Sequence, residues 1–298
     1  MNWVFPLQTG LEMGLVMFFA VLGLAIAFRL LNFPDLTIEG SFLLGAVGFA
    51  VMRRSGFDMW SAILAAQVLG AFAGVVTGSL HARFNINKFL AAVIVVSICY
   101  TAALRLMGTS NIGLLSSASI FDQLDSWGDA FGVQAGKILF LLLAASAIGG
   151  VTVLALSSRT GLRWRVAGSN PTYARTLGIG VVASTMIGLG VTNALAALSG
   201  ALLAVHQGFA DVGLGQGVLI FALASMSLGD RLLSEQRLSV PIFVVVSSMV
   251  GSVVYQYLIA LSVSAGLNPV DLKLITAVLV LMLVIVRAKR HDDPFASV

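Results

Sequence analysis

Charged residues are scarce in this sequence of 298 residues: Asp, Glu, Lys and Arg together make up 10%, whereas hydrophobic residues make up 58%. The mean hydropathy is +1.00. A soluble domain of this length needs a polar exterior, and this composition does not supply one. The sequence therefore predicts a multi-pass membrane protein whose outer surface contacts lipid.

Motifs for chemistry are also lacking. The single cysteine, Cys99, lies in an apolar run and cannot form an intrachain disulfide. No His-Glu-x-x-His, Cys-x-x-Cys or Ser-His-Asp set occurs, and the three histidines are scattered: His81, His206 and His291. The segment GVQAGKI, residues 132–138, has too few residues between its glycines for a phosphate loop, and Ile138 follows its lysine. We therefore expect no catalytic residue, metal or cofactor in this chain.

Apolar segments long enough to cross a membrane recur along the whole chain. With a spanning helix of about 20 residues in mind, the sequence predicts about nine of them, and the second and seventh are short. They are 7–28, 36–52, 61–80, 88–107, 136–157, 181–205, 212–228, 240–262 and 270–287. The longest gaps, 108–135 and 158–180, leave no room for a soluble domain, so residues 1–298 are predicted to form one all-α transmembrane domain.

The basic residues predict the orientation. The net charge of +4 and pI of about 9.6 are typical of cytoplasmic loops in a membrane protein, and we expect no nucleic-acid partner. With the C-terminus inside, twelve Lys and Arg residues fall on the inner side and five on the outer side. The pair Arg53-Arg54 is the main exception. The N-terminus and the loop 108–135 are then outside, and the loop 158–180 is cytoplasmic.

The polar stretch GSNPTYARTLG, residues 168–178, interrupts this apolar chain. Ser169 or Asn170 suits a helix N-cap, Pro171 suits the first helical position, and Gly178 suits the residue after a helix. These signals predict a helix of about two turns over TYARTL, which is too short to be stable unless it docks on something. The alternative is an ordinary capped helix in a loop.

The surrounding WRVAGSNPTYARTLGI, residues 164–179, resembles a cytoplasmic loop of ATP-binding cassette importer permeases of the branched-chain amino acid and ribose type, which has the pattern RAxGxNPxxARxxGI. The matching residues are Arg165, Gly168, Asn170, Pro171, Ala174, Arg175, Gly178 and Ile179. Val166 stands where the pattern has Ala, and Thr172-Tyr173 replace its usual acidic residue.

A second stretch supports this resemblance. LNFPDLTIEGSFLLGA, residues 31–46, resembles the start of the second span in the same family, most closely in the branch of tryptophan and tyrosine transport permeases. The resemblance implies that this cytoplasmic loop forms a coupling helix, Pro171 to Leu177, on an ATPase subunit that carries ATP and Mg. The implied coupling residues are Arg165, Gly168, Asn170, Pro171, Ala174, Arg175 and Gly178. It further implies two permease copies, two ATPase subunits, an extracytoplasmic binding protein and a location in the bacterial inner membrane.

Carboxylates near the second and seventh segments suggest where a solute could cross. Asp35 and Glu39, at i and i+4, share one face of a helix start, and FADVGLGQG at 209–217 weakly repeats FPDLTIEG at 33–40. Such a repeat at interrupted helices is typical of transporters, although chance explains it as well. The residues predicted for the translocation path are Phe33, Asp35, Thr37, Glu39, Ser41, Asn193 and Asp211. The alternative is that the acids only favour the positive ends of helices.

Three acids in the outer loop, Asp122, Asp125 and Asp129, would share one face of a helix. They suggest a docking site for the binding protein, and a solvated face is the alternative. Gly70, Gly74 and Gly78 are predicted to allow close helix packing. The function predicted from all these features is the permease subunit of an ATP-driven importer for a small organic solute, with an amino acid as one candidate. A secondary transporter or channel that uses Asp35, Glu39 or Asp211 is the alternative.

Overall fold

The computed structural model describes residues 4–114, 133–233, 238–266 and 278. Eight long helices lie in these ranges: α1 (Val4–Arg29), α2 (Thr37–Arg54), α3 (Met59–Ala82), α4 (Lys88–Met107), α6 (Val133–Ser157), α9 (Val181–Gln207), α10 (Val218–Leu232) and α11 (Val240–Ser264). The shorter elements are α7 (Arg159–Ser169), α8 (Pro171–Thr176), the 3-10 turn η2 (Val212–Gly215), β1 (Asn111–Gly113) and β2 (Phe209–Asp211).

The predicted spans correspond to these helices one by one. Seven segments of the described chain are long and apolar enough to cross a membrane, and α2 is the eighth helix at a predicted position. Its three charged residues, Glu39, Arg53 and Arg54, lie at its two ends. The all-α polytopic fold is therefore confirmed for the described part of the chain. The predicted ninth segment, 270–287, lies outside that part except for residue 278, and the sidedness of the termini stays a prediction.

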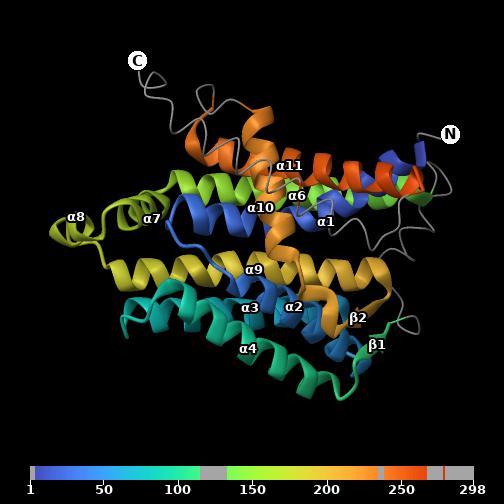
Figure 1. Cartoon of the computed structure of the whole chain (residues 1–298), viewed down its shortest axis with the longest axis horizontal. Coiled ribbons are helices and arrows are strands. Elements are labelled where there is room, and N and C mark those ends of the chain that lie inside the picture. Colours follow the sequence, from blue (N-terminus) through green and yellow to red (C-terminus); the bar gives the residue numbers. More distant parts are fainter. Residues whose placement is uncertain (1–3, 115–132, 234–237, 267–277, 279–298) are drawn as a thin grey trace.

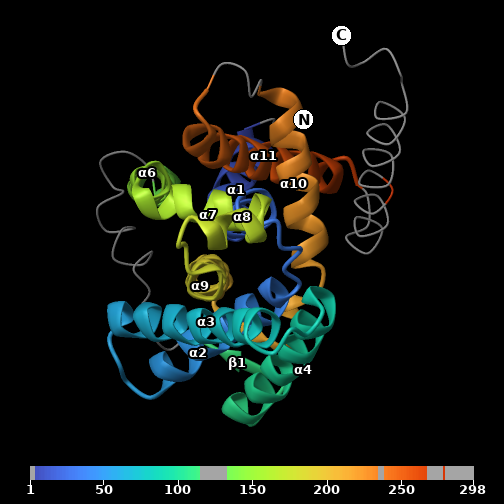
Figure 2. The same cartoon turned by 90° about the vertical axis from the view of Figure 1, so that its left-hand side faces the viewer.

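The centre of the molecule is α9. Figure 1 shows it between a layer that contains α1, α6 and α11 and a layer that contains α2, α3 and α4, and Figure 2 shows α10 running from the second layer to the first. At one end, β1 and β2 pair antiparallel, with Asn111 opposite Asp211. Because α9 contacts α1, α2 and α3, residues on it can meet side chains from both layers.

Two helices begin inside the bundle rather than at its edge. After α1 the chain forms no regular structure over residues 30–36, and Figure 1 shows it turning back into the bundle before α2 starts. After α9, β2 and η2 lead to Gly217, whose φ of 88° is left-handed, and α10 starts at the next residue. The interruptions predicted for the second and seventh segments are present, and each is made of backbone that must find its partners inside the protein.

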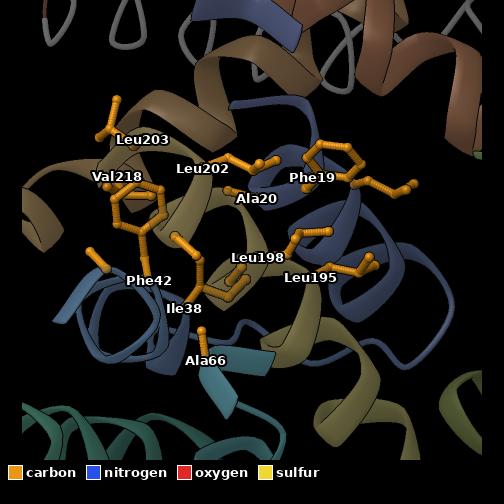
Figure 3. Close-up of a cluster of buried hydrophobic side chains, with 14 of the residues drawn as sticks. Phe19, Ala20, Ile38, Phe42, Ala66, Leu195, Leu198, Leu202, Leu203 and Val218 are labelled. Carbon is orange, nitrogen blue, oxygen red and sulfur yellow. The ribbon is translucent and has the colours of Figure 1, made fainter. Parts of the chain in front are cut away.

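Large apolar side chains fill the space where these helices meet. Figure 3 shows Phe19 of α1, Ile38 and Phe42 of α2, Leu198 of α9 and Val218 of α10 in one buried cluster. The cluster thus joins both interrupted helices to α1 and α9.

Small residues bring the backbones around α9 close together, as the sequence predicts. A Cβ at Gly70 or Gly74 of α3 would overlap backbone atoms of Asn193 or Leu189 of α9. Gly45 of α2 meets Ala197 of α9 in the same way. The glycines therefore act in helix packing, where a larger residue would force the helices apart.

One ion pair joins α1 to the second half of the chain. Arg29 pairs with Asp230 of α10, and it also donates to Ser247 Oγ of α11 at 3.2 Å. Its guanidinium lies 4.9 Å from the centre of the Phe243 ring. No local pattern in the sequence indicates that Asp230 lies opposite Arg29.

We predict that Gly74→Leu destabilises the fold, whereas Gly150→Leu does not. Gly74 lies against α9, but nothing lies within 4 Å of a Cβ at Gly150 on the exposed face of α6. Overpacking should lower the apparent Tm by about 5 °C or more. Cys99 is buried, so a thiol-reactive dye would report thermal unfolding of the detergent-solubilised protein. Equal Tm values for the two variants would contradict the packing role.

Candidate functional site

A network of polar side chains lies at the start of α2, among otherwise apolar helices. Asn193 Nδ2 of α9 donates to Asp35 Oδ2 at 2.6 Å and to the Leu189 carbonyl at 2.9 Å. Ser41 Oγ donates to Asn193 Oδ1 at 2.6 Å. One amide side chain therefore ties α2 and the segment before it to the middle of α9.

A pair of hydroxyls extends this network to α3. Thr37 Oγ1 lies 2.8 Å from Thr77 Oγ1. Thr77 Oγ1 also lies 3.1 Å from the Ala73 carbonyl, and either hydroxyl of the Thr37–Thr77 pair can be the donor. Thr77 is not among the residues predicted from the sequence, because a single threonine in an apolar helix carries no signal of its own.

The central network (Asp35, Thr37, Ser41, Thr77 and Asn193) is sealed from solvent, since all five side chains are 0% exposed. Asp35 Oδ1 also accepts the backbone N–H of Thr37 at 2.9 Å. The N-cap residue Leu36 has no side chain able to do this, so Asp35 satisfies an N–H group that the helix start leaves open. The structure brings together four of the predicted path residues in one buried group.

Glu39 lies apart from this network, at the start of the other interrupted helix. Its Oε1 accepts the N–H groups of Gly217 at 3.1 Å and Leu219 at 3.3 Å. The N-cap of α10 is Gly217, which has no side chain, so the carboxylate of α2 caps α10 in its place. A carboxylate at the positive end of a helix is favourable, and this contact locks the two interrupted helices to each other.

Asp211 and Phe33 occupy separate positions. Asp211 Oδ1 accepts the N–H of Gly213 at 2.6 Å and so caps η2. Phe33 is 1% exposed, and the Lys88 ammonium lies 5.5 Å from its ring centre. The same ammonium donates to the Asn32 carbonyl at 2.7 Å. In the part of the chain that the structure describes, neither Phe33 nor Asp211 hydrogen-bonds to the central network, although both flank the interruptions.

The short polar helix predicted around residue 171 is present as α8. Asn170, not Ser169, is its N-cap, because Asn170 Oδ1 accepts the N–H of Tyr173 at 2.9 Å. Pro171 is at the first position, and Gly178, with a φ of 72°, allows the left-handed turn that follows. Figure 1 shows α8 at one extremity of the molecule. Ala174 is its one buried residue, and the rest of α8 is exposed.

Helix α7, which the sequence analysis did not predict, supports α8. Ser169 is its last residue, and Trp164 on its inner face is 6% exposed. A Cβ at Gly168 would overlap the Leu30 carbonyl, so α7 lies directly on the turn after α1. Arg165 is half-buried, and its Nε has no hydrogen-bond partner in the described chain. Among the predicted coupling residues, Gly168 and Ala174 therefore face inward, whereas Pro171 and Arg175 are exposed.

Other predicted features lie elsewhere or outside the description. Asp122, Asp125 and Asp129 fall in residues 115–132, which the structure does not describe. Within the described ranges, no group of three His, Cys, Asp or Glu side chains could hold a metal ion. Ser199 Oγ donates to the Val16 carbonyl of α1 at 2.8 Å, the contact between helices that an isolated polar residue in a membrane helix usually makes.

Membrane-spanning helices, two of them interrupted around buried polar groups, together with a short exposed helix at one extremity are features of a multi-pass transport protein. The chain belongs to the family described as branched-chain amino acid transport system / permease component, whose model matches residues 7–286. It is a permease and a multi-pass protein of the bacterial inner membrane.

Individual relatives agree with this assignment. A tyrosine transport system permease protein of Clostridioides difficile is 34% identical over 90% of this chain and 86% of its own length. An uncharacterized protein of Rickettsia prowazekii is 29% identical over 96% and 99%. An autoinducer 2 import system permease protein of Enterobacter sp. is 29% identical over 65% of this chain and 55% of its own length. No solved structure gives a significant match.

We predict that Asp35→Asn and Asn193→Asp each destabilise the fold, and that the double variant, which exchanges the two side chains, regains much of the lost stability. Asp35→Asn places two amide groups against each other or gives up the bond to Thr37, and Asn193→Asp places two carboxylates in contact. Each should cost about 1–3 kcal/mol or more, because buried groups lose their partners. The double variant again pairs a donor with an acceptor.

The measurement is a double-mutant cycle on the Tm reported by Cys99 labelling. A double variant that regains much of the loss supports direct pairing of residues 35 and 193. Strictly additive losses would show that the two side chains act independently.

Proposed function

We propose that this chain is the pore subunit of an ATP-driven importer. Two copies form the transmembrane part, two ATPase subunits dock on the cytoplasmic side and carry ATP and Mg, and a binding protein delivers a small organic solute. The observation that carries the proposal is α8. It is a six-residue helix that protrudes from the bundle and buries only Ala174, so its own chain gives it little stability.

Contacts of α7 suggest how movement of α8 would reach the centre of the membrane. Gly168 lies against Leu30, and the side chain of Leu31 packs on Gly188 of α9. The same segment continues through residues 32–34 to Asp35, which holds the start of α2. We propose that ATP-driven movement of the coupling helix shifts residues 30–36 and changes the position of α2. ATP can drive such a change only if its bound state favours one arrangement over the other.

The two interrupted helices are the proposed border of the solute path. The side chains of the central network are sealed from solvent, so their proposed role is to position the start of α2. Glu39 and Asp211 are less buried than these side chains. Phe33, Asp35, Thr37, Ser41 and Asn193 would then act on the path through the placement of α2. Movement of α2 would break the contact between Glu39 and α10, which makes this contact a natural point of control.

An amino acid is the proposed class of solute. The support is the name of the Clostridioides difficile relative, a tyrosine transport system permease protein. We further propose that the binding protein docks on the outer loop 108–135 and that Asp122, Asp125 and Asp129 pair with basic residues on it.

A secondary transporter or channel is the second candidate, favoured by one observation. Asp35 is buried with no ion-pair partner in the described residues, and a buried carboxylate of this kind can bind a proton or cation during transport. Such a protein would work without an ATPase.

We predict that affinity-purified wild-type permease carries an ATPase subunit and that Arg175→Glu loses it. Arg175 is exposed on α8, so its replacement should leave the fold intact, as a Tm equal to wild type would verify. Arg54→Glu, at the far end of α2, is the control and should retain the partner. Solute uptake that persists in vesicles without any ATPase would contradict the importer and favour the second candidate.

We predict that Gly168→Ala uncouples ATP hydrolysis from transport. The added methyl group has no room against Leu30 and would move α7 off the turn. The exposed residues of α8 would remain, so the ATPase should still co-purify. Uptake in proteoliposomes should fall by at least about tenfold, a loss of about 1.4 kcal/mol of coupling.

The matched control is Gly180→Ala in the same loop, where the nearest atom to an added Cβ, that of Ala183, is 3.9 Å away. Normal uptake by Gly168→Ala, with the ATPase still attached, would disprove the proposed route through residues 30–36.

A further inference from the structure

Only one oxygen of the Glu39 carboxylate is used in the fold. Oε1 accepts two N–H groups at the start of α10, at 3.1 and 3.3 Å. Within the described chain, Oε2 has no hydrogen-bond partner and is not sealed from solvent. A carboxylate oxygen without a partner is costly inside a membrane unless it meets water or a cation. The second oxygen of Glu39 is therefore open to a ligand.

The hydroxyl group of Tyr100 on α4 lies beside Glu39. A Cβ at Gly215 would lie 2.6 Å from the Glu39 carbonyl oxygen and 3.3 Å from Tyr100 Oη, so both atoms adjoin the same glycine of η2. Tyr100 is half-buried, and its hydroxyl has no hydrogen-bond partner among the described residues. A tyrosine hydroxyl can accept a hydrogen bond, and the face of its ring attracts cations.

The surface of α4 next to Tyr100 is exposed and partly polar. Ser97, three residues before Tyr100, is exposed and lies on the same side of the helix. Thr101 and Arg105 are also exposed and are four residues apart, so they continue the polar surface along α4. Exposed ionisable side chains of a membrane helix usually face a water-filled cavity rather than lipid. This surface would let water and a polar solute approach Tyr100.

The chemistry of these groups suits a primary ammonium group better than a metal ion. A divalent cation such as calcium takes about six or more oxygen ligands, and the described ranges contain no group of three His, Cys, Asp or Glu side chains that could hold a metal. A primary ammonium group has three N–H donors and a positive charge. One N–H can bond Glu39 Oε2, a second can bond Tyr100 Oη, and the third is left for water.

We propose that Glu39 and Tyr100 form a binding site for a primary ammonium group of the transported solute. This inference rests on the proposed function and adds the chemical group that the solute path recognises. Glu39 has two roles in it, because Oε1 caps α10 while Oε2 receives the cation. A solute that lacks the ammonium group would leave the Glu39 charge unpaired, so the site favours amines over acids of the same shape.

The first test measures the charge at this position with thiol reagents. Full-length permease with Cys99→Ala and Ser97→Cys, in nanodiscs, is treated with a trimethylammonium or a sulfonate methanethiosulfonate, and each rate is divided by that with free cysteine. The cationic reagent should be favoured by at least about tenfold, because a carboxylate lies nearby. Glu39→Gln, which keeps an acceptor for α10, should remove most of this preference, with a thermal melt as the check that it folds.

Two controls accompany this measurement. Glu12→Gln, which neutralises a half-buried glutamate of α1, should keep the charge preference at residue 97. Leu143→Cys on α6, where the leucine is 62% exposed, represents a surface in contact with lipid and should react slowly with both reagents.

The second test uses methylammonium chloride as the probe for the ligand class. At about 50 mM it should slow the cationic reagent at residue 97 by at least about threefold, whereas NaCl and tetramethylammonium chloride at the same concentration should slow it much less, because they screen charge but donate no N–H. Tyr100→Phe removes the hydroxyl and should reduce this protection without changing the charge preference.

Three results would overturn the inference. Slow reaction with both reagents at residue 97, as at residue 143, would place Ser97 against lipid. A charge preference that survives Glu39→Gln would mean that another group produces it. Equal protection by all three salts would reduce the effect to screening. The proposed function fails separately: if the charge preference and the methylammonium protection hold but no ATPase co-purifies with wild-type permease, the importer is wrong and the ammonium site remains.

Discussion

The hydrogen bond from Asn193 to Asp35 fixes the centre of this protein. Non-helical backbone within a membrane has no bulk water to hydrogen-bond with, so its N–H and C=O groups need partners within the protein. Asp35 provides one of these partners for the start of α2, and Asn193 holds Asp35 in place from the middle of α9. Ser41 and the pair Thr37–Thr77 then complete the network, so that the interruption is stable despite its apolar surroundings.

At the second interruption, a residue of α2, which follows the first interruption, caps the start of α10. Gly217 allows the left-handed turn before α10 but has no side chain to cap it, and Glu39 of α2 provides the cap. The start of α2 depends on Asn193 of α9, and the start of α10 depends on Glu39 of α2. These contacts couple α2, α9 and α10 mechanically. Gly168 extends this coupling to α7 and α8, because its missing side chain lets α7 lie on the turn before the first interruption.

Local signals in the sequence predict much of this architecture. Apolar segments predict eight helices of the described chain, and Asn170, Pro171 and Gly178 predict α8 because capping depends on neighbours along the chain. The acids before α2 indicate a special helix start for the same reason. The contacts of Arg29 with Asp230 and of Glu39 with Gly217 join residues that are 201 and 178 positions apart, and no local pattern encodes such distances. Thr77 was missed for this reason, and α7 was missed because its arginines resemble those of an ordinary cytoplasmic loop.

The separation of Asp35 and Asn193 also has a consequence for biosynthesis. They lie 158 positions apart, so at 5–20 residues per second the ribosome adds Asn193 roughly 8–30 s after Asp35. During that interval α2 and α3 are synthesised, but the Asp35 carboxylate lacks its amide donor and is costly to bury in lipid. The first three helices can reach their final packing only when α9 inserts among them. The polypeptide therefore completes its central packing around a helix that is synthesised late.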